Sequence, residues 1–375
     1  MNIVILASIG SQNLGDELIL KNEIKILEER YSKQMNLLKE NINFIVFTYE
    51  QEDNFYTAEN VKYREYFPIG MKNPKNIFRN IKNFIIFLKE IIKTDLVVIG
   101  GGGIFYDSEN QSVGSPLKQW LFRVRVAKLF KKQIEIFRVS IDIKYKKNLL
   151  IIKDIFTNID TVSVRDNYSF ELLKGLSIIK NVSIIKDPVF FDNYNGEENT
   201  EDEYLINTLN KTFLTDCLQS KNLNIDNFKN IIDINDISGK TFGISLRKMN
   251  IDNYFENILS VLNYIVDNNG SIIFIPHSFH KTDEVANDYI FQNELYSELG
   301  KKYNTQISNK KLQISICKNL EESYGMYKSK KIDINLAQRL HSIILSQVYG
   351  INFIGISYSQ KTDEVLKQLK KNLPN

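Results

Sequence analysis

Two arginines and a histidine are the residues of this sequence whose types and spacing are best suited to chemistry. Arg339, Leu340 and His341 follow the predicted strand 332–334, and Arg247 follows the predicted strand 241–246. Guanidinium groups bind phosphate and carboxylate oxygens in pairs. Histidine exchanges protons near neutral pH. These residues therefore predict a pocket for a small dianionic substrate, with His341 as its acid or base.

A second histidine is expected near the same pocket. His277 follows the predicted strand 271–275, so it approaches the carboxyl end of that strand, and we expect it to contact the same substrate. His280 is three residues further on, and no other metal-binding side chain is close in the sequence. The spacing of these two histidines does not form a zinc site without further ligands. The sequence therefore predicts no metal site.

A polar turn near the start of the chain is the other strong candidate. Asn13, Gly15, Asp16 and Glu17 follow the apolar run 3–6 and open a predicted helix. The free N–H groups at a helix start bind anions and hydroxyl oxygens. The two carboxylates could accept hydrogen bonds from a sugar or take a proton from an attacking hydroxyl. Alternatively, Asp16 only caps the helix and Glu17 only complements its dipole. The spacing leaves both readings open.

Four glycines, 100–103, follow another apolar strand and remove its side chains where the strand ends. Either a ligand or another part of the chain must come close there. We expect Gly101 and Gly102 to contact substrate, Tyr106 to stack on a sugar ring and Asp107 to bind hydroxyl groups. The glycine spacing differs from the dinucleotide-binding fingerprint.

Arg165 also lies where a predicted strand gives way to a helix. It could face the substrate, or it could pair with a carboxylate and hold its loop, and the second role is the more common one. The sequence contains neither a nucleophile elbow nor a Walker A loop, which argues against acyl-enzyme chemistry and nucleotide hydrolysis.

The elements that must position these residues alternate between short apolar runs and longer amphipathic stretches. This pattern predicts an α/β protein with two Rossmann-like domains that face a central cleft. Predicted strands cover residues 2–7, 43–48, 96–99, 134–139, 161–164, 182–185, 241–246, 271–275, 312–316, 332–334 and 352–356. Predicted helices cover residues 16–30, 75–93, 117–131, 149–157, 167–174, 253–267, 283–299, 320–328, 338–349 and 361–371.

Changes in composition set the predicted domain boundaries. Residues 1–190 form an amino-terminal α/β domain, and 240–350 form a carboxyl-terminal one. Between them, 191–239 is rich in Asn and acidic residues and predicts a linker with an inserted helix at 204–218. The last strand and helix, 351–375, are expected to cross back to the first domain.

The composition limits the class of protein. The chain has 375 residues, a net charge of +3 and two cysteines. It lacks an apolar run of the ~20 residues that a membrane span needs and a basic amino-terminal region typical of a signal peptide. We therefore expect a cytoplasmic protein without nucleic-acid partners. Lysine clusters at 131–132, 144–147 and 370–371 could contact the inner face of the membrane, although solvated surface is the more common role.

Taken in order, these motifs resemble the polysaccharide pyruvyl transferase family. The similar pieces span nearly the whole chain: residues 13–17, 100–103, 164–169, 187–190, 243–247, 339–341 and 350–361. The resemblance implies a GT-B-like fold. It also implies transfer of a pyruvyl group from phosphoenolpyruvate to two sugar hydroxyls, which forms a ketal on a cell-surface glycan or its precursor, without a cofactor.

The resemblance also implies residue roles and partners. Arg247 and Arg339 would bind the donor, His341 would act as acid or base, and the first domain would hold a saccharide acceptor, which could be lipid-linked. One departure is that residues 140–144 lack the glycine and proline that the family usually has there. Two alternatives stay open: a GT-B glycosyltransferase that uses a sugar nucleotide, and a degenerate glycan-binding scaffold protein.

Overall fold

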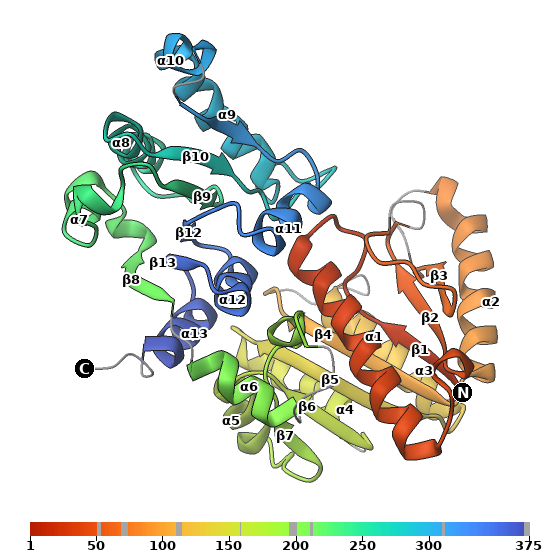
Figure 1. The fold of residues 1–375 in the computed structure, drawn as a ribbon. Coiled ribbons are helices and arrows are strands. Elements are labelled where there is room, and N and C mark those ends of the chain that lie inside the picture. Colours follow the sequence, from red (N-terminus) through yellow and green to blue (C-terminus); the bar gives the residue numbers. More distant parts are fainter. Residues whose placement is uncertain are drawn as a thin grey trace. The chain divides into compact units, whose positions relative to one another are not determined.

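The computed structural model describes residues 1–50, 54–68, 74–109, 115–157, 159–194, 201–210, 213–309 and 312–370. The chain forms two compact α/β units (Figure 1). The first contains residues 1–10 and 16–188, and the second contains 11–15 and 189–375. Each unit is built on one parallel sheet, which confirms the predicted pair of Rossmann-like α/β domains.

The first unit has a seven-stranded sheet in the order β3-β2-β1-β4-β5-β6-β7, and all its strand pairs are parallel. Six of the strands coincide with predicted ones. The edge strand β3 was missed, because its sequence VKYRE has no apolar run. The strands are β1 (Asn2–Leu6), β2 (Asn43–Thr48), β3 (Val61–Glu65), β4 (Leu96–Tyr106), β5 (Gln133–Asp142), β6 (Thr161–Val164) and β7 (Val182–Ile184).

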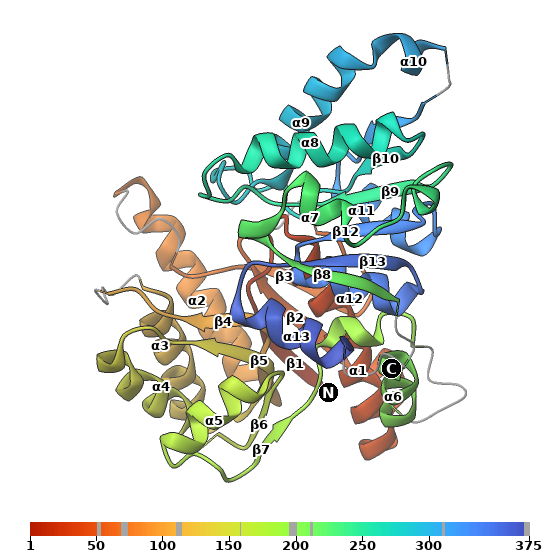
Figure 2. The same ribbon diagram turned by 90° about the vertical axis from the view of Figure 1, so that its left-hand side faces the viewer.

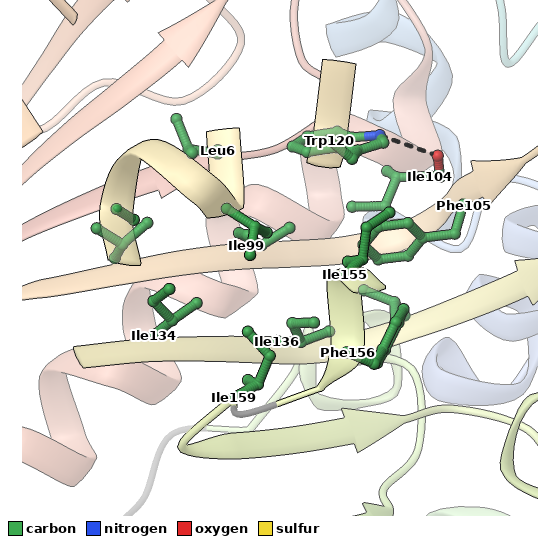
Figure 3. Packing of buried hydrophobic residues seen from close by; sticks show 14 of the residues in the cluster. Leu6, Ile99, Ile104, Phe105, Trp120, Ile134, Ile136, Ile155, Phe156 and Ile159 are labelled. Atoms are coloured by element: carbon green, nitrogen blue, oxygen red, sulfur yellow. Dashed lines mark hydrogen bonds between the residues drawn. The ribbon is translucent and has the colours of Figure 1, made fainter. Parts of the chain in front are cut away.

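Helices cover both faces of this sheet. Strands β2 and β3 lie on one side of β1 and β4 to β7 on the other, and right-handed crossovers in these two directions place their helices on opposite faces. α1 (Leu14–Met35) lies on one face (Figure 1). The others are α2 (Ile77–Lys93), α3 (Pro116–Leu129), α4 (Leu149–Phe156) and α5 (Asn167–Gly175). Residues of α2, α3 and α4 share one apolar core with β4 and β5. In this core, Trp120 donates its indole N–H to the carbonyl of Ile104 at 3.1 Å (Figure 3).

The second unit has a six-stranded parallel sheet in the order β11-β10-β9-β12-β13-β8. Figure 2 shows β10, β9, β12, β13 and β8 of this sheet. Its strands are β8 (Leu214–Gln219), β9 (Thr241–Ser245), β10 (Ser271–Phe274), β11 (Ile314–Ile316), β12 (Ile334–Ala337) and β13 (Asn352–Ser357). Its helices are α6 (Glu201–Asn210), α7 (Ile225–Lys229), α8 (Tyr254–Asp267), α9 (Asp288–Lys302), α10 (Asn304–Ser308), α11 (Leu320–Lys328), α12 (Leu340–Tyr349) and α13 (Gln360–Lys370).

The structure corrects the predicted linker at 191–239. The inserted helix ends at Asn210, and the chain then forms β8, which pairs with β13 and belongs to the second sheet. Leu214, Cys217 and Leu218 have the spacing of an amphipathic helix, so the local pattern misled the prediction. Residues 195–200 and 211–212 of the predicted linker lie outside the described residues.

The structure also corrects the predicted return of 351–375 to the first domain. β13 lies inside the second sheet, between β12 and β8. The following helix, α13, buries Leu366 and Leu369 in a cluster with Phe353 of β13. This segment is therefore part of the second unit, and residues 371–375 lie outside the described part of the chain.

Candidate active site

The carboxyl edge of the second sheet gathers most of the predicted donor-binding residues. β10, β9 and β12 are neighbours, and their carboxyl ends lead to His277, Arg247 and Arg339 respectively. His341 lies in the first turn of α12, directly after Arg339. Parallel strands bring their carboxyl ends to one edge, which is where open α/β sheets bind ligands.

Residues 11–15 belong to this site. The N–H of Leu14 donates to the carbonyl of His277 at 2.8 Å, and Asn13 forms an antiparallel bridge with Ser278. A side chain at Gly15 would overlap the His341 ring, so the ring packs directly against the Gly15 backbone. The Asn13 side chain accepts the N–H of Gly15 at 3.0 Å, which stabilises the turn. Asn13 and Gly15 are therefore next to the two histidines, and their contact with substrate stays a prediction.

His277 is held as a neutral ring. It is only 2% exposed, and its Nε2 lies 2.8 Å from the hydroxyl of Tyr327. Burial lowers the pKa of His277 well below its usual value, and the positive charges of Arg339 and His341 lower this pKa further. Its Nδ1 is buried and has no hydrogen-bond partner among the described residues. A ligand atom that bonded to Nδ1 would satisfy this orphaned group.

A buried polar network that sequence reasoning missed fixes the position of His277. The Tyr327 hydroxyl also lies 2.9 Å from Oγ of Ser245, and Asn335 donates to Ser342 and Ser346 at 3.0 and 2.9 Å. Burial raises the pKa of Tyr327 to about 12, so this hydroxyl stays protonated. The signal in the sequence was a polar residue inside each of two apolar strands, β9 and β12.

Arg339 is engaged by a carboxylate that the sequence analysis did not single out. Its Nε and Nη2 donate to the two oxygens of Asp288 at 2.7 and 2.5 Å. The side chain of Arg339 is 14% exposed and that of Asp288 is fully buried. Asp288 therefore neutralises part of the charge of Arg339 and fixes its position, and donor binding by Arg339 stays a prediction. Leu340, which follows it, is half-buried at the start of α12.

Arg247 is the cation best suited to an added anion. Its backbone N–H donates to Oε1 of Gln338 at 2.7 Å, which anchors it beside the end of β12. Its guanidinium carbon lies 5.3 Å from the centre of the Tyr358 ring. Its Nε is buried and has no hydrogen-bond partner within the described part of the chain. A phosphate or carboxylate oxygen would supply that partner.

Asp16 and Glu17 differ in their surroundings within the first unit. Glu17 is buried and accepts the N–H of Gly10 at 3.0 Å, so it closes the loop that follows β1. Asp16 is half-buried, and a Cβ added to Gly102 would lie 3.5 Å from its Oδ1. Of the two carboxylates, Asp16 is therefore the better placed to meet a ligand above the glycine run.

The glycine run packs closely against α1. Gly101 and Gly102 have φ of +58° and +84°, which side-chain-bearing residues rarely adopt. A Cβ on Gly101 would overlap Ile19, and one on Gly100 would overlap the carboxylate of Glu23. The close approach that the glycines allow is therefore made by helix α1, and contact of Gly101 and Gly102 with substrate stays a prediction.

A small polar pocket of about 70 Å³ lies near the carboxyl edge of the first sheet. Tyr106 lines it, and stacking of Tyr106 on a sugar ring stays a prediction, because the pocket is smaller than a whole sugar ring. Its other lining residues were missed, because they come from separate segments: Ser8, Tyr49, Ile104, Pro116, Gln119, Trp120 and Arg123. The guanidinium of Arg123 lies over the rings of Tyr66 and Trp120 at 4.2 and 4.5 Å.

Two predicted substrate ligands hold loops in place. Both oxygens of Asp107 accept hydrogen bonds from 144–148, including one from Nδ2 of Asn148 at 2.8 Å. Arg165 forms a buried ion pair with Asp187 and donates to Oγ of Ser140 at 2.6 Å. The ion pair with Asp187 fits the loop-anchoring alternative for Arg165, and substrate binding by Arg165 and hydroxyl binding by Asp107 stay predictions.

The family can be assigned from a comparison with family models. The model described as "Polysaccharide pyruvyl transferase" matches residues 13–360, which is nearly the whole chain. The chain belongs to the polysaccharide pyruvyl transferase family. No curated protein matches its sequence.

Several solved structures resemble this family member at low identity. A glycosyltransferase from Rickettsia africae ESF-5 is 12% identical, with a TM-score of 0.45 over 99% of this chain and 87% of that one. A 2,6-sialyltransferase from Photobacterium sp. JT-ISH-224, in complex with CMP and lactose, is 10% identical, with a TM-score of 0.46 over 98% and 76%. The fold assignment itself rests on the two parallel sheets.

In this pyruvyl transferase family member, the predicted residues form two groups. Asn13, Gly15, His277, Arg339 and His341 come together at the carboxyl edge of the second sheet. Asp16, Gly102 and Tyr106 form the other group, in the first unit. Across the described ranges, no group of three or more His, Cys, Asp or Glu side chains could hold a metal ion.

Proposed function

We propose that this protein transfers a pyruvyl group from phosphoenolpyruvate to two hydroxyls of a saccharide and so forms a cyclic ketal. The observation that carries this proposal is the site at the edge of the second sheet. It combines the buried Nε of Arg247 and the buried Nδ1 of His277, both without a partner among the described residues, with the ring of His341. A donor with a phosphate and a carboxylate would supply the oxygens that these nitrogens need.

Each site residue has a distinct task in the proposed reaction. Arg247 and the Nδ1 of His277 bind oxygens of the donor, and Arg339, held by Asp288, adds positive charge beside them. His341 donates a proton to the methylene carbon of phosphoenolpyruvate, which leaves an oxocarbenium-like centre at the neighbouring carbon. A positioned acid of this kind contributes about 10²–10⁴-fold to the rate.

The acceptor completes the reaction. One sugar hydroxyl attacks the oxocarbenium carbon and loses its proton to Asp16 or Glu17, with Asp16 favoured because Glu17 is buried in the β1–α1 loop. The bond from that carbon to the phosphate oxygen breaks, and inorganic phosphate leaves. A second hydroxyl then bonds to the same carbon, gives its proton to the departing phosphate, and closes the ketal. The acceptor, a cytoplasmic glycan precursor, would place part of one sugar ring in the pocket beside Tyr106.

The proposal is tested by incubating the protein with phosphoenolpyruvate and candidate glycans. We expect one phosphate released for each ketal detected by mass spectrometry. His341→Ala should lower turnover about 10²–10⁴-fold. His280→Ala is the matched control, because His280 lies in a nearby surface loop where its Nδ1 accepts the N–H of Asp283, and it should leave turnover unchanged. Equal rates for both variants would remove His341 from the mechanism.

Ligand-induced stabilisation separates this proposal from its rivals. A ligand present at about 100 times its dissociation constant stabilises the folded protein by ~2.7 kcal/mol. Stabilisation by phosphoenolpyruvate is expected here. Stabilisation by a sugar nucleotide alone would favour a glycosyltransferase, and glycan binding without phosphate release would favour a binding protein.

A further inference from the structure

The outer face of α2 carries an unusual number of exposed apolar side chains. Ile77, Phe78, Ile81, Ile85 and Ile92 are all exposed, and Phe78 is 85% exposed. At about 100° per residue along a helix, these five side chains fall within one arc of about 100°. The buried residues of α2, among them Phe87 and Ile91, lie on a different side, against the core of the first unit. The exposed stripe is therefore additional to the face that holds the helix in the fold.

Positive charge runs beside this apolar stripe. Lys82, Lys89 and Lys93 are exposed and fall on the arc next to the stripe. Its neighbour α3 adds Lys118 and Arg125. Glu90 is the single acidic residue in the two helices, and it pairs with Arg64. The whole chain has a net charge of only +3, so α2 and α3 concentrate its positive charge.

An apolar groove adjoins α2 and extends the surface toward α3 and α4. It has a volume of about 450 Å³ and is lined by Phe67, Pro68, Lys118, Gln119, Leu121, Phe122, Arg125 and Ile151. The rings of Phe67 and Phe122 both contact Phe84 of α2, with centroids 5.0 and 6.3 Å apart. The groove and the helix therefore belong to one surface of the first unit.

We propose that this surface docks the protein on an anionic lipid bilayer, with α2 lying in the plane of the interface. A helix with Phe and Ile on one face and Lys and Arg beside them inserts its apolar face among the headgroups. Each Lys or Arg near an anionic membrane surface adds to the attraction. α2 has 17 residues, and within the described residues no helix is long and apolar enough to span a membrane.

Charge decides between a bilayer and a second copy of the chain. A two-fold symmetric dimer through this surface would place the same lysine-bearing helices against each other. Like charges in contact across an interface oppose association. An anionic bilayer instead meets both features, since it accepts the apolar stripe and attracts the lysines.

The test is co-sedimentation of the full chain with vesicles of phosphatidylcholine alone or with phosphatidylglycerol added. We expect binding to the anionic vesicles only, and weaker binding when salt shortens the range of electrostatic attraction. Phe78→Ser combined with Ile81→Ser should weaken binding at least about tenfold, since each loses a large inserted side chain. Lys82→Glu combined with Lys89→Glu should weaken binding to anionic vesicles in the same way.

Val285→Ser is the matched control, because Val285 is also highly exposed but lies in the second unit. It should bind vesicles as the unaltered protein does. Absence of sedimentation with anionic vesicles, or equal binding by the Phe78 and Ile81 variant, would overturn the proposal. A dimer in analytical ultracentrifugation that this variant dissociates would also overturn it, in favour of a second copy. These outcomes are independent of pyruvyl transfer, because the assay needs neither donor nor acceptor.

Discussion

Replacing Asp288 by Asn tests whether the site depends on the ion pair with Arg339. The two side chains share two hydrogen bonds, of 2.7 and 2.5 Å, and the carboxylate is fully buried. Removing one partner of a buried pair leaves the other charge uncompensated, which costs about 3–5 kcal/mol. With a urea m-value of about 2 kcal/mol/M, a loss of 3 kcal/mol moves the unfolding midpoint by roughly 1.5 M.

Unfolding of the second unit can be followed separately from that of the first. The single tryptophan, Trp120, lies in the core of the first unit, so its fluorescence follows the unfolding of that unit. Far-UV circular dichroism follows both units, so a transition seen by circular dichroism and not by fluorescence belongs to the second unit. Glu298→Gln is the matched control in the same helix, α9. Its partner is Lys301, and both side chains are exposed, so its loss should cost less than about 1 kcal/mol. A midpoint for Asp288→Asn within about 0.3 M of the unaltered protein would refute the reasoning.

A double variant separates the structural part of this pair from its part in the reaction. Asp288→Leu combined with Arg339→Met replaces both charges by apolar groups, which often restores the stability lost in single variants. If the positive charge of Arg339 also acts on the donor, the refolded double variant should still have low turnover. Full turnover in the double variant would show that the pair only supports the fold.

Two further predictions concern the neighbouring residues. Because the pKa of His277 is lowered in the folded protein, the unfolded chain binds an extra proton as pH falls through about 6.5. Folding stability should then fall by up to ~1.4 kcal/mol per pH unit in this range, and His277→Gln should lack this contribution. Parallel stability curves for the two proteins between pH 5 and 7 would contradict it. Gly15→Ala should lower turnover at least about tenfold, since the added methyl group must displace the His341 ring. Gly300→Ala in α9, where a Cβ meets nothing within 4 Å, is the control and should stabilise the protein by about 0.5–1 kcal/mol.

The sequence by itself determined the class of fold and the neighbourhood of the site. Apolar runs such as 3–6 and 96–99 form central parallel strands, because burial on both faces demands continuous apolar residues. Polar residues that follow the predicted strands, including Arg247, Arg339 and His341, lie at the carboxyl edge of the second sheet, where open α/β sheets bind ligands. These features are local, so the order of residues was enough to find them.

Only the tertiary structure decided which polar groups are engaged and with which partners. Arg339 pairs with Asp288 and Arg165 with Asp187, and neither partner can be chosen from spacing, since many carboxylates were available. The strand β8 likewise exists because β13 pairs with it, although its own pattern suits a helix. Contacts between residues far apart in the chain depend on how the sheets assemble, and that information is absent from any local stretch of sequence.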